Sequence, residues 1–304
     1  MNPSLVLLQS ATMFAMAGSV LALSTYVKLW TGLLSFATVS FAALGAFGSV
    51  YLYTETGLGL WGSVVVASLG SGVAGLVVGR VFLKLSSHWL ALATVALVLI
   101  TRVFVVNLGD YTGGSAGEVV PYTMSIWQML VLLVVVCAVL FLLKRSKFGV
   151  AADTTREDPA VAAALGVPVA RVKVIAFGLS GAIGAVGGAM QASQLSYIDP
   201  DTFYINLSVT VIASVVLGGA YHWFGSVIGA AVFTGMPVYI SQYITEGQSI
   251  INGALLLAII LFLPGGLIDP LRWRRLRERR RARSRPSAPP TTSDRELEQA
   301  GASR

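Results

Sequence analysis

The side chains best suited to catalysis or metal binding are few and far apart in this chain of 304 residues. There are two histidines, His88 and His222, and one cysteine, Cys137, which lies in an apolar run and has no second cysteine with which to form an intramolecular disulfide. A catalytic nucleophile needs a base nearby, and a metal site needs several ligands together. We therefore expect no enzyme active site, no cofactor and no metal, and we assign these three side chains to packing.

Hydroxyl groups are the polar side chains that recur within the apolar segments, and Arg102 is a rare charge among them. No acidic residue stands inside these segments, whereas ion-coupled carriers usually contain buried ionisable groups. We expect Arg102 to pair with Asp110 or to extend to a membrane surface; the alternative is contact with a substrate carboxylate. The pattern suits the passage of a small apolar or zwitterionic solute. The hydroxyl-bearing residues are Ser24, Thr25, Ser35, Thr38, Ser40, Thr94, Ser208 and Thr210.

The densest group of charges is in residues 144–173, "KRSKFGVAADTTREDPAVAAALGVPVARVK", between two stretches of about 25 residues that have none. Its alanines predict one or two short helices, with Thr154 or Thr155 as a cap and Gly166 closing the last turn. Long ordered loops are usually functional. We expect this loop to present a docking surface; the alternative is a plain solvated connector.

Composition places these segments in a membrane. The chain is 55% hydrophobic and 12% charged, against about 25% charged residues in a typical soluble domain, and its mean hydropathy is +0.77. A transmembrane helix needs roughly 20 consecutive apolar residues, and the chain supplies many such runs. We expect an all-α, polytopic transmembrane helical bundle with no sizeable soluble domain.

The charge-free runs predict nine membrane-spanning helices. Only "GGAYHWFG" separates the seventh from the eighth, so a count of eight or ten, with one re-entrant segment, stays open. The first run lacks a basic leader, and we expect it to be a retained helix rather than a signal peptide. The expected ranges are 5–26, 30–53, 57–79, 85–105, 121–143, 174–197, 203–220, 225–244 and 248–267.

Charges between the runs alternate in sign along the chain. Basic residues follow every second crossing, from Lys28 through Arg80 and Lys84 to residues 144–173. Positive charge marks cytoplasmic loops, so we expect 144–173 to be cytoplasmic and the acidic loops to be external, with Trp30, Trp89, Trp127 and Trp223 in the interfacial belt. The external acids are Glu55, Asp110, Glu118, Asp199 and Asp201.

The formal net charge of +7 comes from the last residues, 272–304, which contain eleven arginines and four acids. Such a segment binds anionic lipid headgroups, and its composition beyond Pro286 is typical of disorder. We therefore divide the chain into a membrane domain, 1–271, and a basic, mostly disordered cytoplasmic tail, 272–304. Because the basic excess is confined to this tail, it does not indicate nucleic-acid binding.

Glycine is frequent in the later helices, at spacings that allow close helix contacts. Gly184 and Gly188 form a GxxxG pair, as do Gly225 and Gly229, and small residues let membrane helices approach backbone to backbone. We expect packing roles for Gly184, Gly188, Gly218, Gly219, Gly225 and Gly229.

Several stretches, in order from about residue 30 to 270, resemble the permeases of ABC importers, and more narrowly the branched-chain amino acid permease family (the LivM-type subunit). They are "TGLLSFATVSFAALGAF" (31–47), "YTGGSAG" (111–117), "REDPAVAAALGVPVARVKVIAFGLSGAIGAVGGAMQA" (156–192), "YIDP" (197–200), "SVTVIASVVLGGAYHWFGSVIGAA" (208–231) and "ILFLPGGLID" (260–269). Urea and short-amide importers use similar permeases. The chain departs from the family pattern at Ala37, Thr38, Leu99 and Ala160.

The resemblance implies a non-enzymatic permease subunit in a bacterial inner membrane, driven by cytoplasmic ATPase subunits. It also implies a second, related permease chain and an extracytoplasmic substrate-binding protein. The chain contains no GxxxxGK[ST] phosphate loop, so ATP must be bound elsewhere. The substrate implied is a branched-chain or other hydrophobic amino acid; the alternatives are urea or a short amide, or an ion-coupled carrier acting alone.

The resemblance also suggests which residues would act. Coupling to the ATPase would fall to Arg156, Glu157, Ala162, Ala163 and Gly166. The substrate path would include Ser35, Thr38, Ser40, Phe41 and Thr94.

Overall fold

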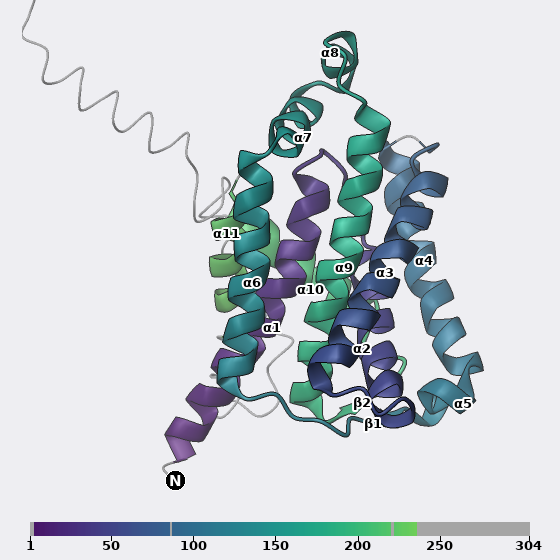
Figure 1. Ribbon diagram of the computed structural model, residues 1–304, viewed down its shortest axis with the longest axis vertical. Helices are drawn as coiled ribbons and strands as arrows, with labels where there is room; N and C mark the ends of the chain where they lie inside the picture. The colour runs from purple at the N-terminus through teal and green to yellow at the C-terminus, as the bar shows by residue number, and fades with distance from the viewer. Residues whose placement is uncertain (1–2, 86, 220–221, 236–304) are drawn as a thin grey trace, which may run out of the picture. The chain divides into compact units, whose positions relative to one another are not determined.

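The computed structural model describes residues 3–85, 87–219 and 222–235, which fold into a helical bundle (Figure 1). Its only strands in these ranges are β1 (Glu118–Val119) and β2 (Tyr197–Ile198), which pair antiparallel. The helices are α1 (Pro3–Leu29), α2 (Thr38–Glu55), α3 (Leu60–Phe82), α4 (Ser87–Asn107), α5 (Gly109–Thr112), η1 (Gly114–Ala116), α6 (Ile126–Arg145), α7 (Lys147–Glu157), α8 (Pro159–Ala164), α9 (Val169–Leu195), α10 (Ile205–Gly218), α11 (Trp223–Ala230) and the π-helical turn η2 (Ala231–Gly235). The expected helical fold is therefore present.

Five helices in the described ranges are long and apolar enough to cross a membrane: α1, α3, α4, α6 and α9. Large apolar side chains stay exposed along α4 and α6, including Ile100 and Val134. Such a surface is unusual for a soluble protein but suits contact with lipid tails. The protein is thus a multi-pass membrane protein. The expected helix 248–267, the end of 225–244 and the tail 272–304 lie outside the described residues.

The centre of the bundle is formed by α2 and α9, with α1 and α3 packed against them. Small residues allow the backbones to meet. A Cβ atom on Gly45 would overlap the backbone of Ala185, and one on Gly188 would overlap the carbonyl oxygen of Ala42. A Cβ atom on Gly184 would lie 3.1 Å from the Ser24 hydroxyl. These approaches bury α2 along most of its length, so it faces protein rather than lipid.

The second helix starts later than its sequence predicts. The expected range was 30–53, whereas α2 begins at Thr38 and a tight turn occupies the residues after Leu29. The carbonyl of Lys28 accepts from the amides of Thr31 and Leu33, and Gly32 has a φ of +78°, which favours glycine. Residues 30–37 are mostly apolar and carry no charge, so hydropathy alone could not separate this turn from the helix.

The helices α10 and α11 form a close antiparallel pair. A Cβ atom on Gly218 would overlap the carbonyl oxygen of Gly225, and one on Gly229 would overlap that of Ser214. Gly219, with a φ of +98°, ends α10. The 14 residues of α10 are ~21 Å long at 1.5 Å per residue, which is shorter than the ~30 Å hydrocarbon core of a bilayer.

The two ends of the bundle carry different loops (Figure 1). The helices α7 and α8 lie at one end, and α5, β1 and β2 lie at the other. The basic segment 144–173 therefore lies opposite the acidic segment that contains Asp110 and Glu118, which agrees with the alternation of charge along the sequence.

Candidate functional site

The loop between α6 and α9 is folded as two short helices, as its alanines predict. Its caps differ from those expected: Thr154 and Thr155 lie inside α7. The Ser146 side chain accepts from the amide of Phe148 at the start of α7, and Asp158 accepts from the amides of Ala160 and Val161 at the start of α8. Serine and aspartate are strong N-caps, and Asp158 precedes a proline at the first helical position.

Gly166 ends α8 with a left-handed turn. Its φ is +83°, its amide donates to Ala163, and the amide of Val167 donates to Ala162, each at 3.0 Å. These two bonds form a Schellman motif, which satisfies carbonyls that the end of a helix leaves unpaired. The local geometry of α8 is thus fixed at both ends.

The loop is fastened to the end of α1. The indole Nε1 of Trp30 donates to Asp153 at 2.6 Å, and the Trp30 ring stacks on Tyr26 and meets Phe148 edge-on. Trp30 is only 2% exposed, so its expected place in an interfacial belt is wrong. It instead joins α1 to α7, a long-range contact that no sequence motif signals.

A shallow groove of about 260 Å³ runs between α7 and α8 on the outer side of the loop. Val161 and Leu165 line it and are 55% and 74% exposed, beside the acids Glu157 and Asp158. Ala162, proposed from the sequence as a contact residue, also lines the groove but is itself 1% exposed. The two exposed apolar side chains were missed from the sequence because they resemble ordinary helix residues.

A larger cavity, about 620 Å³, lies on the inner side of the loop. Ala163 and Arg156 line it together with Thr31, Gly32 and Leu90, so it extends from α8 to the turn after α1 and to α4. Of the expected coupling residues, Ala163 and Arg156 thus border this cavity, while Glu157 borders the outer groove.

The five residues expected along the substrate path are all buried, and they lie on α2, the turn before it and α4. The Thr94 hydroxyl accepts from the amide of Phe36, and the Ser35 hydroxyl accepts from that of Ala37. The Ser40 hydroxyl is buried and has no hydrogen-bond partner within the described part of the chain. Hydrogen bonds to hydroxyls therefore help hold the turn that leads into α2.

Lys28 was expected in a cytoplasmic loop, but the structure places it in the last turn of α1 with 0% exposure. Its Nζ donates to Thr38 Oγ1 at 2.7 Å, and that oxygen lies 2.7 Å from Thr25 Oγ1. The rings of Phe41 and Phe177 lie 5.7 and 5.8 Å from the nitrogen, within cation–π range. The expected position is wrong because α1 continues past Lys28 and α2 and α9 cover it.

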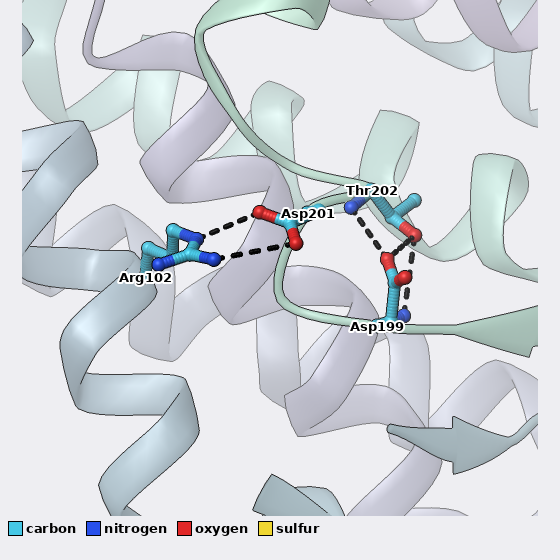
Figure 2. Close-up of polar contacts among 4 residues, drawn as sticks. All are labelled: Arg102, Asp199, Asp201 and Thr202. Carbon is cyan, nitrogen blue, oxygen red and sulfur yellow. Dashed lines mark hydrogen bonds and ion pairs between the residues drawn. The ribbon is translucent and has the colours of Figure 1, made fainter. Parts of the chain in front are cut away.

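At the opposite end, Arg102 pairs with Asp201 rather than with Asp110 (Figure 2). Its Nε and Nη2 atoms donate to the two carboxylate oxygens at 2.7 and 3.3 Å. Asp199 beside it accepts from the amide and the hydroxyl of Thr202, which holds the turn after β2. The pair links α4 to the segment before α10, a partner that sequence proximity could not indicate.

This exposed pair should contribute little to stability. We expect Arg102→Gln, Asp201→Asn and the double variant to give the same small fall in melting temperature, because exposed ion pairs are weak and the two changes remove one interaction. The Arg102 guanidinium lowers the pKa of Asp201. The contribution is thus present above the ordinary aspartate pKa of about 3.9 and is lost as the pH falls through the lower folded value. Thermal melts in detergent across this range test it; additive losses would contradict the pairing.

Two of the three potentially reactive side chains lie in packing environments, and the His88 side chain is outside the described ones. Cys137 is partly buried on α6. His222 Nδ1 lies 3.2 Å from Lys144 Nζ, and burial, followed by the charge of Lys144, lowers the pKa of His222. The described residues hold no cluster of three or more histidine, cysteine or acidic side chains that could bind a metal.

Comparison with known proteins assigns the chain to a family. Residues 7–261 match a family described as "Branched-chain amino acid transport system / permease component". The LivM branched-chain amino acid permease proteins of Salmonella typhimurium and Escherichia coli are each 28% identical over 277 residues, covering 80% of this chain and 65% of their own length. The L-arabinose permease protein AraH of Azospirillum brasilense is 28% identical over 247 residues, covering 74% of this chain and 70% of its own length.

No solved structure matches the chain. The chain spans 65% of the length of the LivM relatives. The family match extends over most of the chain, from the first helix to beyond η2, and includes both the central bundle and the loop of α7 and α8. The chain therefore belongs to the family of permease components of branched-chain amino acid transport systems.

Proposed function

We propose that this chain is the membrane-spanning permease subunit of an ABC importer that carries branched-chain or other hydrophobic amino acids into a bacterial cell. It crosses the inner membrane nine times and places α7 and α8 in the cytoplasm. The observation that carries the proposal is a rigid loop, fastened to α1 through Trp30 and Asp153, that exposes an apolar groove. A loop built in this way can transmit motion from a docked protein to the bundle.

Energy for transport comes from separate ATPase subunits, which dock on the groove between α7 and α8. Leu165 and Val161 supply the apolar contact, and Glu157 supplies a charge beside it, while Arg156 takes part from the inner side of the loop. Interfaces of this kind centre on exposed apolar side chains with a polar rim. Two further partners complete the importer: a second, related permease chain and an extracytoplasmic protein that captures the substrate. The tail 272–304 lies on anionic lipid headgroups.

The solute passes along the buried hydroxyl groups between α1, α2 and α4. Thr38 and Thr94 are two of these, and a separate cavity, lined by Thr31 and Leu90, reaches Ala163 on α8. The close glycine contacts of α2 with α9 and of α10 with α11 let these helices rock as rigid units between two states.

The second candidate function is import of a pentose sugar. It is favoured by the match to AraH and by the XylH xylose/arabinose permease protein of Sulfolobus acidocaldarius, which is 28% identical over 220 residues. Urea and short amides are further candidates for a path lined with hydroxyl groups.

The proposal predicts how ATP hydrolysis depends on assembly. The purified chain alone should hydrolyse no ATP, because it lacks a phosphate loop. The complex with its ATPases, second permease and binding protein should hydrolyse ATP faster when a substrate-loaded binding protein is added. Leucine, arabinose and urea are compared as the substrate in proteoliposomes. Robust hydrolysis by the isolated chain, or stimulation by arabinose but not by leucine, would contradict the proposal.

A further inference from the structure

Lys28 is a buried lysine with no carboxylate beside it among the described residues. The described residues place no carboxylate within ion-pair distance of it, and its neighbours are the hydroxyls of Thr38 and Thr25 and the rings of Phe41 and Phe177. A charge removed from water is costly unless it is paired. One hydroxyl acceptor and two aromatic faces offset only part of this cost, so the position favours the arrival of an anion.

The apolar residues beside Lys28 also border a cavity near α8. Leu33 and Leu90 line this 620 Å³ cavity, and they pack in the same apolar cluster as Phe41 and Phe177. The two rings that face the Lys28 nitrogen therefore belong to a cluster that reaches the cavity lining. The cavity volume falls within the range of ~300–1,000 Å³ that small-molecule sites occupy.

The wall of that cavity is also basic. Arg156 from α7 and Lys173 from α9 both line it, and none of the described residues in its lining is acidic. An anionic group that left Lys28 would therefore pass into a space bordered by positive charge.

We propose that Lys28 binds the carboxylate of the transported amino acid on the cytoplasmic half of the path, with the hydroxyls of Thr25 and Thr38 completing the site. This inference rests on the proposed function, and it deepens it by assigning the substrate class to one residue. A zwitterionic amino acid brings the anion that Lys28 lacks, whereas a pentose or urea does not. Lys28 then selects for a carboxylate.

The test uses the complete importer in proteoliposomes, with the wild-type chain, Lys28→Met and Lys28→Arg. Lys28→Met removes the charge but keeps a flexible side chain of similar size, and Lys28→Arg keeps the charge. Lys84→Met is the matched control, since Lys84 is an exposed lysine just beyond α3. Leucine imported per ATP hydrolysed, the KM for the leucine-loaded binding protein, and assembly of the complex are measured.

We expect Lys28→Met to assemble, while the leucine imported per ATP hydrolysed falls about tenfold or more, as for loss of a charged hydrogen bond. Lys28→Arg should recover most of this loss, and Lys84→Met should match the wild type. Leucine import by Lys28→Met at the wild-type level would overturn the proposal.

The experiment also distinguishes a structural role of Lys28 from failure of the proposed function. If Lys28→Met fails to assemble, Lys28→Gln, which can still donate to Thr38, takes its place; failure of both to assemble would assign Lys28 a structural role and overturn the proposal. If the wild-type importer itself carries no leucine, the proposed function fails, whatever the variants do.

Discussion

Gly45→Leu is expected to prevent this protein from assembling. Gly45 lies on α2 where it crosses α9, and even a single Cβ atom there would overlap the backbone of Ala185. Backbone atoms cannot move aside as a flexible side chain can, so the helices must separate. Overpacking of side chains typically costs about 1–3 kcal/mol, and a clash with backbone at the centre of the bundle should exceed that. Size-exclusion chromatography of the detergent-solubilised protein is the measurement.

Gly70→Leu is the matched control for that change. Gly70 also lies within a membrane-spanning helix, α3, but a Cβ atom there has no neighbour within 4 Å. The substitution adds the same side chain on an open face, so the protein should elute as the wild type does. If both variants elute as the wild type does, or if neither does, the contact of α2 with α9 is not the one described.

Leu165→Asp is expected to abolish coupling while leaving the protein folded. Leu165 is 74% exposed at the end of α8 and borders the groove between α7 and α8. An acid at this position would place an unpaired charge in the proposed interface with the ATPase, and loss of a central apolar contact typically costs more than about 1 kcal/mol of binding. We expect leucine transport to fall at least about tenfold, with normal expression and helical content.

Val150→Asp is the control for this second change. Val150 is 65% exposed on α7, in the same loop, but it is not among the residues that line the groove. Crosslinking from a cysteine at position 165 to the ATPase subunit, in a Cys137→Ala background, gives an independent readout. Wild-type transport by Leu165→Asp together with no crosslink would contradict docking at the groove and indicate that the loop is a plain connector.

Much of the fold could be predicted because hydropathy and charge determine it directly. The runs behind α1, α3, α4, α6 and α9 are predominantly apolar, and the described helices match them to within several residues. The charged segment 144–173 was recognisable because a long polar insertion is unusual in such a chain. Its division into α7 and α8 follows from Pro159 and Gly166, whose backbone preferences are local.

The remainder depends on contacts between distant segments. Lys28 resembles a loop charge in the sequence, and only the packing of α2 and α9 over the end of α1 shows that it is buried. Arg102 had Asp110 nearby in sequence, but the turn after β2 supplies Asp201. Likewise, the sequence alone suggests that Trp30 lies at the membrane interface, and only the structure shows that α7 covers it.

The central claim is that this chain forms the membrane path of an ATP-driven amino acid importer, and uptake of leucine into proteoliposomes tests it most directly. The chain is reconstituted with its ATPase subunits, the second permease and the binding protein, with ATP supplied on the side of α7 and α8. The account predicts that leucine accumulates against its gradient only when ATP and every component are present. Accumulation by vesicles that contain this chain alone, or none by the complete system supplied with ATP, would contradict it.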